Sequence, residues 1–340
     1  MIGDNPCPLA LSLGDPAGIG PELLAAAWAV RMSHKLPPFF AVGGANLLVK
    51  AAQTRGIDLP VRRIAHPSEA VDIFPHALPV WGEMDGDYTP GLPHTSGAQL
   101  ALASLTEATR LTLSGAAAAI VTGPIAKSHL AKIGFTHPGQ TEYVAAACEV
   151  AAENAVMMLA GPALRTVPIT VHLPLSQVPL TLTTALIVTR ARITAAALTR
   201  DFGIAKPRLA IAALNPHAGE DGRMGDEEMR IIAPAIAVLR AEGIDATGPH
   251  PADALFAPHM RPIYDVAICM YHDQALIPLK ALDFDSGVNI TLGLPIIRSS
   301  PDHGTAFGIA GKNIADVGAT IAAIRMAAQC ALRRLTNRSS

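Results

Sequence analysis

The sequence predicts an α/β protein of two lobes, in which a mixed or parallel β-sheet is covered by helices. Short apolar runs alternate with helical stretches along the chain, which is the pattern of such a sheet. The 340 residues exceed the usual size of one hydrophobic core, so we expect two lobes. Half of the residues are hydrophobic and only 16% are charged, which indicates a large core and argues against disorder.

The first third of the chain begins with a predicted strand over residues 9–13, a glycine-rich turn and a helix over residues 23–32. Glycines permit a tight turn at this point, and Pro21 suits a first helical position. The turn does not have the spacing G-x-G-x-x-G, and no Gly-Lys-Ser/Thr follows, so it is neither the usual dinucleotide fingerprint nor a P-loop. The elements expected next are a strand at 39–42, a helix at 45–55, a loop at 79–95, a helix at 96–113 and a strand at 116–121.

Three later strands are each followed by a histidine. The strand at 166–171 ends at His172, the strand at 208–214 precedes His217, and the strand at 266–270 precedes His272. Parallel strands end at one edge of a sheet, where ligands bind, and three imidazoles around an ion form a catalytic zinc pattern. A lone histidine after a strand is more often an ordinary loop residue, and H-E-x-x-H is absent. The residues alone therefore leave both interpretations open.

Several polar side chains follow apolar runs in the same part of the chain. Lys280 and Arg298, together with Asn289 and Thr141, would suit a phosphate or a carboxylate. The alternative is that the two cations only extend from the surface. Asp273 adjoins a candidate metal ligand, so it could orient an imidazole or accept a proton.

Composition excludes several classes of partner. A net charge of −2 provides no basic field that would attract nucleic acid or anionic lipid. Aromatic residues make up only 4% of the chain, which also argues against binding of nucleic acid by base stacking. The uncharged stretch 166–189 contains three prolines, so we expect strand, turn and helix start there and no membrane span. An early Asp and no basic region at the N-terminus predict no signal peptide, hence a cytoplasmic protein. The cysteines are scattered and are expected to be reduced thiols: Cys7, Cys148, Cys269 and Cys330.

Five motifs, spread in order over nearly the whole chain, resemble the 4-hydroxythreonine-4-phosphate dehydrogenase family. They are GDPAGIGPE at 14–22, GQTE at 139–142, LNPHAGE at 214–220, MYHDQ at 270–274 and GVNITLGLPIIR at 287–298. The fold of that family resembles the isocitrate and isopropylmalate dehydrogenases, with two α/β/α lobes around a cleft. The resemblance implies a cofactor-side lobe of residues 1–126 plus 286–340, and a central lobe of residues 127–285 for metal, substrate and dimerisation.

The resemblance also implies an activity: oxidation of 4-phosphooxy-L-threonine with NAD or NADP and loss of carbon dioxide, giving 3-amino-2-oxopropyl phosphate on the way to pyridoxal phosphate. It implies a divalent metal (zinc, or alternatively magnesium or cobalt) on His172, His217 and His272, in a site shared across a homodimer. The implied substrate contacts are Gln140, Thr141, Lys280, Asn289 and Arg298, and the candidates for proton transfer are Asp273 and Lys280. Residues 303–312 are similar to a nicotinamide-cofactor loop, which implies cofactor contacts at His303, Gly304, Thr305 and Ala306.

Two positions depart from the family pattern. Gln140 stands where His is expected, and an amide can donate and accept hydrogen bonds but cannot carry a charge. Gly308 stands where Asp is expected in the cofactor loop. Three other functions remain open: a dehydrogenase of a related sugar-acid phosphate (threonate or erythronate 4-phosphate), a zinc hydrolase that uses metal-bound water, and a metal-binding protein without catalysis.

Overall fold

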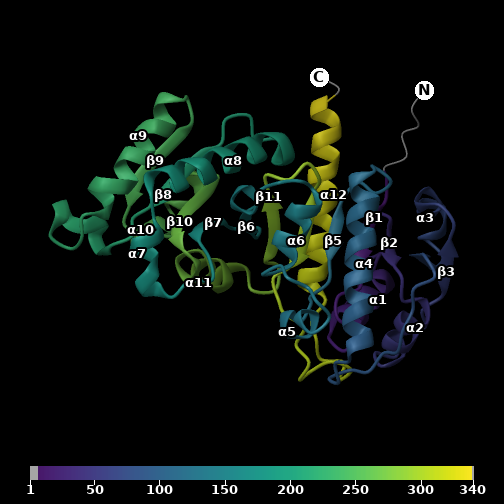
Figure 1. Cartoon of the computed structure of the whole chain (residues 1–340). Helices are drawn as coiled ribbons and strands as arrows, with labels where there is room; N and C mark the ends of the chain where they lie inside the picture. Colours follow the sequence, from purple (N-terminus) through teal and green to yellow (C-terminus); the bar gives the residue numbers. More distant parts are fainter. Residues whose placement is uncertain (1–6, 339–340) are drawn as a thin grey trace. The chain divides into compact units, whose positions relative to one another are not determined.

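The computed structural model describes residues 7–338 and divides into two compact units (Figure 1). Unit 1 contains the described residues of Met1–Ala152 and Leu294–Leu332, and unit 2 those of Glu153–Gly293 and Arg333–Ser340. Strands and helices alternate in both units, which confirms the predicted α/β class. Compared with the lobes expected from the resemblance, residues 127–152 lie in unit 1 and residues 286–293 lie in unit 2.

Within the described residues, the strands of unit 1 form a parallel sheet in the order β3-β4-β2-β1-β5-β12. Their bounds are β1 Leu9–Ser12, β2 Phe39–Val42, β3 Val61–Ile64, β4 Leu78–Trp81, β5 Ile120–Thr122 and β12 Arg298–Pro301. Parallel strands covered on both faces are apolar throughout, and every residue of β1 and β2 is buried. The carboxyl ends of β1, β5 and β12 therefore open at one edge of this sheet.

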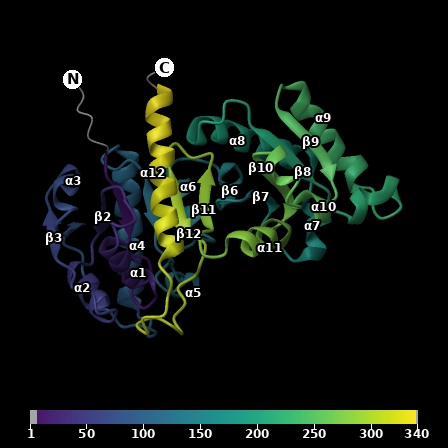
Figure 2. The same cartoon turned by 180° about the vertical axis from the view of Figure 1, so that it is seen from behind.

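Helices cover both faces of the sheet of unit 1. In Figure 1, α4 lies in front of the strands, and in the reversed view of Figure 2, α12 lies in front of them. The helices are α1 Gly20–Ala29, α2 Ala45–Gln53, α3 Ala70–Ile73, α4 Thr95–Leu113, α5 Lys127–Ala131, α6 Gln140–Ala147 and α12 Gly318–Arg338. The residues of α12 from Arg333 onward are grouped with unit 2.

The sheet of unit 2 is mixed and has the order β11-β6-β7-β10-β8-β9 among the described residues. β6 runs antiparallel to both β11 and β7, whereas the pairs β7–β10, β10–β8 and β8–β9 are parallel. Their bounds are β6 Val156–Ala160, β7 Arg165–Thr170, β8 Arg208–Ala212, β9 Asp245–His250, β10 Val266–Tyr271 and β11 Val288–Leu292. The three strands expected to precede the candidate histidines are therefore adjacent and parallel.

The helices of unit 2 also lie on two sides of its sheet. Both views show α8 and α9 above the strands and α11 below them. α8 packs against α9, and α11 packs against β6, β7 and β10. The bounds are α7 Val178–Thr181, α8 Thr184–Phe202, α9 Ala233–Ala241, α10 Ala252–Leu255 and α11 His272–Asp283.

Residues 166–189 divide into β7, the 3-10 turn Leu175–Gln177, α7 and the start of α8, as expected from their prolines. No helix in the described part of the chain is both long and apolar enough to cross a bilayer. The four cysteines are free thiols, as expected. The first six residues, on which the prediction of no signal peptide partly depends, lie outside the described residues.

Candidate functional site

The three candidate histidines of unit 2 follow neighbouring parallel strands. β10 pairs with β7 on one side, with Tyr271 opposite Thr170, and with β8 on the other. His172 follows β7, His272 directly follows β10 as the first residue of α11, and His217 lies in the turn after β8. The expectation that all three strand ends lie at one edge of one sheet is confirmed.

His172 and His272 face each other. Their ring centroids are 5.9 Å apart, and His272 Nδ1 lies 2.7 Å from Asp273 Oδ1. A carboxylate on one ring nitrogen fixes the imidazole and leaves Nε2 to act as a ligand, which is the usual arrangement behind a metal-bound histidine. The two rings border a hollow of about 350 Å³ together with Thr170 and Tyr271. In donor chemistry and mutual distance, this pair fits a divalent cation.

His217 is not joined to this pair within the single chain. Among residues 7–338, no group of three His, Cys, Asp or Glu side chains is arranged to hold a metal ion. The structure thus brings two of the three predicted ligands together and leaves the third in the turn after β8. The complete triad stays a prediction.

The backbone at two of these histidines is left-handed. His172 has φ +53° and His217 has φ +50°, and the four residues after His217 also have positive φ. Non-glycine residues in this region are uncommon, although histidine tolerates it better than most. Residues in such uncommon backbone conformations cluster at active sites and ligand-binding sites, where the surrounding structure stabilises them. The positive φ values therefore favour a functional role for both turns.

Unit 1 contains a buried cation with neutral hydrogen-bond partners. Arg298, the first residue of β12, is 4% exposed and donates from Nη2 to Thr122 Oγ1 (2.9 Å) and from Nη1 to Thr141 Oγ1 (3.2 Å). Burial lowers the pKa of Arg298 to about 10, while the Glu142 carboxylate acts in the opposite direction, so the guanidinium is charged at neutral pH. Thr141 lies in the first turn of α6, where backbone N–H groups favour anions. This arrangement can bind a phosphate.

Gln140 lies beside this cation site as the first residue of α6. Its Nε2 donates to the carbonyl oxygen of Gly123 at 2.9 Å, which ties α6 to the loop after β5. Its Oε1 is buried and has no hydrogen-bond partner among the residues that the structure describes. The amide orientation follows from the acceptor that Nε2 faces, because the reverse orientation would place two oxygens together.

Lys280 and Asn289 belong to unit 2, whereas Gln140, Thr141 and Arg298 belong to unit 1. Lys280 lies in the last turn of α11 with its Nζ 5.9 Å from the ring centre of Phe284. Asn289 lies on β11, and its buried Oδ1 has no hydrogen-bond partner in the described part of the chain. A buried amide oxygen of this kind is an acceptor available for a ligand donor.

The predicted cofactor loop, with His303, Gly304, Thr305 and Ala306, connects β12 to α12 and is held by the segment after β1. Ile19 N donates to Thr305 O at 3.0 Å, and Gly311 N donates to Glu22 Oε2 at 3.2 Å. Glu22 is fully buried, and desolvation raises the pKa of its carboxyl. Arg55 Nη1 lies 3.9 Å from Glu22 Oε1 and donates to Ala315 O at 3.1 Å. The motif at residues 14–22 thus supports the loop.

The loops after β1 and β5 are in direct contact through two glycines. A methyl group on Gly14, whose φ is +71°, would lie 2.5 Å from Pro124 O. A methyl group on Gly123 would lie 2.7 Å from both Gly14 N and Leu13 O. Only glycine allows the two backbones to approach this closely.

The family model of the pyridoxal phosphate biosynthetic protein PdxA matches residues 35–327. The chain belongs to the PdxA family. A relative from Erythrobacter litoralis named 4-hydroxythreonine-4-phosphate dehydrogenase is 60% identical over 333 residues, which cover 98% of this chain and 99% of the relative. One of the same name from Zymomonas mobilis is 54% identical, with 96% of each chain covered.

Solved structures agree with this membership. The crystal structure of 4-hydroxythreonine-4-phosphate dehydrogenase from Klebsiella pneumoniae has a TM-score of 0.85 and 38% identity, covering 96% of this chain and 98% of that one. A terephthalate 1,2-cis-dihydrodiol dehydrogenase from Burkholderia xenovorans has a TM-score of 0.64 and 28% identity, with 95% and 98% covered. These relatives of the PdxA-family chain are named as oxidoreductases.

Sequence reasoning missed two residues that this PdxA-family structure places beside the predicted ones. Thr122 holds Arg298, and the carbonyl of Gly123 holds Gln140. Thr122 is the last residue of the apolar strand β5 and Gly123 follows it, so both lie at a strand end, which is the signal that singled out the three histidines. Gly308, which replaces the aspartate expected in the cofactor loop, has open space around it, because a Cβ there would meet no atom within 4 Å. The aspartate expected of the family would therefore fit at this position.

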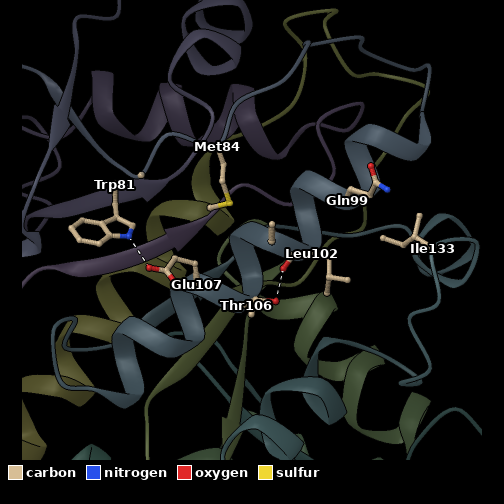
Figure 3. Close-up of a pocket in the computed structure, with 9 residues that line it drawn as sticks. Trp81, Met84, Gln99, Leu102, Thr106, Glu107 and Ile133 are labelled. Carbon is tan, nitrogen blue, oxygen red and sulfur yellow. Dashed lines mark hydrogen bonds between the residues drawn. The ribbon is translucent and has the colours of Figure 1, made fainter.

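A hollow of about 530 Å³ on the side of α4 is lined by none of the predicted site residues (Figure 3). Its polar groups largely satisfy one another, because Trp81 Nε1 donates to Glu107 Oε1 at 2.8 Å and Thr106 donates to Leu102 O at 2.8 Å. The rest of its lining is mainly apolar, including Met84 and Ile133. It has no group suited to acid–base or metal chemistry that is left available.

Proposed function

We propose that the chain catalyses the NAD(P)-dependent, divalent-metal-dependent oxidation of 4-phosphooxy-L-threonine, with decarboxylation to 3-amino-2-oxopropyl phosphate, in pyridoxal 5′-phosphate biosynthesis. The observation that carries the proposal is the pair of facing imidazoles, His172 and His272, in a chain that is 60% identical to a protein named for this reaction. The buried cation Arg298, beside the N-terminus of α6, supports a phosphorylated substrate.

The metal would be held by His172 and His272 with His217. Two of these imidazoles face each other in one chain, so the proposal has the third supplied by a second copy in a homodimer. Zinc suits three nitrogen donors with one open position, and magnesium or cobalt are the alternatives. When bound, the ion supplies a Lewis acid that lowers the pKa of a coordinated hydroxyl.

The chain's own residues bind and orient the substrate. Arg298 and Thr141 would grip the phosphate, converting its binding energy into orientation of the reacting carbon. Asn289 would contribute its buried amide oxygen to a substrate donor. The loop with His303, Gly304, Thr305 and Ala306 would position a nicotinamide, and this group would supply the hydride acceptor.

Two residues are proposed to handle protons and orientation. Asp273 Oδ1 lies 2.7 Å from His272 Nδ1, which supports a role in holding that imidazole. Lys280 carries an ammonium with three donors, and it would deliver a proton to the carbon from which carbon dioxide has left. Asp273 would therefore orient His272, and Lys280 would be the proton donor.

The decisive measurement is dinucleotide reduction by the purified chain supplied with 4-phosphooxy-L-threonine. We expect turnover with NAD or NADP when divalent metal is present, and loss of turnover after treatment with a chelator. The His217→Ala variant should be inactive under both conditions. Full activity of the chelator-treated wild type, or of His217→Ala, would contradict the metal site.

A substrate panel distinguishes the related reactions. Arg298 and Thr141 favour a phosphorylated substrate, so the dihydrodiol named for the Burkholderia xenovorans relative should not be oxidised. Faster oxidation of threonate or erythronate 4-phosphate than of 4-phosphooxy-L-threonine would shift the assignment to a sugar-acid phosphate. A zinc hydrolase would release its product without any dinucleotide.

A further inference from the structure

The turn that carries His217 is left-handed over five consecutive residues. Residues 217–221 have φ values of +50°, +54°, +79°, +44° and +54°, and only the third is a glycine. Left-handed helical backbone costs roughly 1–2 kcal/mol for each non-glycine residue, and L-residues ordinarily adopt it singly. A run of this length needs surrounding contacts that hold it in place.

Glu228 supplies contacts on the side where the chain enters the turn. Its carboxylate is buried, with the residue 3% exposed. Oε1 accepts hydrogen bonds from the backbone N–H groups of Leu214 and Asn215, both at 2.8 Å, and Oε2 accepts one from Asn215 Nδ2 at 2.9 Å. Leu214 and Asn215, which lie three and two residues before His217, are therefore fixed by one carboxylate.

The same carboxylate also lies against the middle of the turn. A methyl group placed on Gly219 would lie 2.7 Å from Glu228 Oε2 and 2.8 Å from Gly225 O. A backbone hydrogen bond from Met224 N to Gly219 O, at 3.0 Å, joins the turn to the segment that follows it. Glu228 thus bonds to the chain before His217 and lies close to the chain after it.

Glu228 begins a π-helical turn, η5, over Glu228–Ile232. Such turns are rare and often occur at functional sites, because the wider turn changes the direction of the side chains near it. Here the carboxylate is directed to the end of β8, away from water. A charge buried in this way is retained only where it has several strong partners.

We propose that Glu228 is a positioning residue for His217: by accepting hydrogen bonds from Leu214 and Asn215 and lying close to Gly219, it fixes the left-handed turn that presents the imidazole to a metal ion. This inference rests on the proposed function, because it takes His217 as a ligand. Glu228 itself does not touch the metal. A purely structural role would stabilise the fold equally with and without metal.

The test compares metal affinities. In Glu228→Gln the side-chain oxygen can still serve Leu214 and Asn215, but the new NH₂ faces Asn215 Nδ2, so one attraction becomes a clash of donors. We expect the dissociation constant for Co²⁺, measured by equilibrium dialysis of the whole chain, to rise about 10- to 100-fold, as for other residues that orient ligands. The matched control is Glu220→Gln, an exposed carboxylate of the same turn, which should bind Co²⁺ like the wild type.

A double-mutant cycle identifies the route of the effect. If Glu228 acts through His217, adding Glu228→Gln to His217→Ala should weaken Co²⁺ binding no further than His217→Ala alone. Losses that multiply in the double variant, or unchanged affinity in Glu228→Gln, would overturn the inference. If His217→Ala binds Co²⁺ as tightly as the wild type, the proposed metal role of His217 fails instead, and the two failures are thereby separated.

A second variant covers the case in which Glu228→Gln does not fold. Asn215→Ala removes the donor to Oε2 but keeps the carboxylate and both backbone contacts. It should weaken Co²⁺ binding by a smaller factor in the same direction. Wild-type affinity in a folded Asn215→Ala protein, measured beside an apo melting temperature, would count against the proposal.

Discussion

Arg298 is charged, buried and hydrogen-bonded to two threonine hydroxyls. A substitution at Arg298 should therefore weaken the binding of the substrate phosphate and leave the binding of the dinucleotide unchanged. Lysine keeps the charge of Arg298 but cannot reach Thr122 and Thr141 at once. Loss of a hydrogen bond to a charged group costs roughly 1.5–3 kcal/mol. We expect Arg298→Lys to raise KM for the phosphorylated substrate about 10- to 100-fold, with KM for the dinucleotide unchanged.

The control for that prediction is Arg325→Lys, in an exposed contact of Arg325 with the backbone oxygen of His34. It should leave both KM values at the wild-type level. An Arg298→Lys enzyme whose KM for the phosphorylated substrate is also normal would show that the phosphate binds elsewhere.

Glu22 allows a prediction about pH. Desolvation raises the pKa of this buried carboxyl above its ordinary value of 4.5, against the opposing effects of Gly311 and Arg55. The folded chain therefore holds this proton more tightly than the unfolded chain. The free energy of unfolding should fall as pH rises from 4.5 through the raised pKa, and then become level with respect to this group.

The Glu22→Gln variant removes this titration. Urea unfolding at a series of pH values should show that the wild type loses unfolding free energy relative to Glu22→Gln between pH 4.5 and neutrality. Glu83→Gln changes an exposed carboxylate and should keep the wild-type dependence. A constant difference between wild type and Glu22→Gln across this range would contradict the assignment.

At the scale of elements, α8 and the end of α12 are joined by a buried carboxylate. Asp201 is 3% exposed and accepts bonds from Arg200 (Nε 2.8 Å) and Arg334 (Nε 2.5 Å, Nη2 3.1 Å). Burial alone would raise the pKa of Asp201, but the two guanidinium groups outweigh it and lower the pKa. Its contribution to stability is therefore present above the ordinary value of 3.8 and is lost as pH falls.

We expect Asp201→Asn to lower the free energy of unfolding by roughly 2–4 kcal/mol at neutral pH, because two cations lose a buried partner. The difference from the wild type should shrink as the pH falls below 3.8. Urea unfolding measures both values. The exposed pair Asp226–Arg230 is the control, and Asp226→Asn should change stability by no more than about 0.5 kcal/mol.

The elements that the sequence predicted well are the buried, uninterrupted ones. β2 has the expected bounds, β1 and β8 are shorter than predicted only at their ends, and α4 begins one residue before its predicted start. The prediction of a loop from residue 79 was wrong at its start, where β4 (Leu78–Trp81) lies. The edge strands β3 and β9 were not predicted either, for a physical reason. β3 has the sequence VRRI and β9 has DATGPH, so charged residues, glycine and proline replace the apolar alternation of a covered strand.

The candidate site was predictable where a side chain follows a strand and unpredictable where the backbone is unusual. His172 and His272 came from strand ends, and they do face each other. The left-handed turn at 217–221 and the π-helical turn at Glu228 have no local sequence signature, since their conformations depend on contacts between segments. Glu228 lies in an acidic run that reads as an exposed helix start, yet its side chain is buried.

At the scale of the whole molecule, the facing pair of histidines predicts how two inactive variants combine. In the proposed homodimer, each metal site would take His172 and His272 from one chain and His217 from the other. Mixing His172→Ala with His217→Ala protein would then create one intact site in each mixed dimer. After random exchange of subunits, about a quarter of the wild-type activity should return.

The activity is measured after unfolding and refolding the two variants together, and again after refolding each alone. The proposed arrangement predicts no activity in either separate sample. Mixing His172→Ala with His272→Ala is the control, because both substitutions fall in the same half of each site and no intact site can form. Equal recovery in this control, or no recovery in the first mixture, would contradict the shared site.

The contact between Gly14 and Gly123 has a mechanical consequence for unit 1. The two loops touch backbone to backbone, with no side chain between them that could change rotamer and absorb a displacement. The loop after β1 leads to α1, where Glu22 accepts a hydrogen bond from Gly311 N. The loop after β5 contains Gly123, whose carbonyl oxygen accepts a hydrogen bond from Gln140 Nε2. A displacement of the loop after β1 must therefore displace the loop after β5 as well. These two loops are expected to move together as one rigid unit.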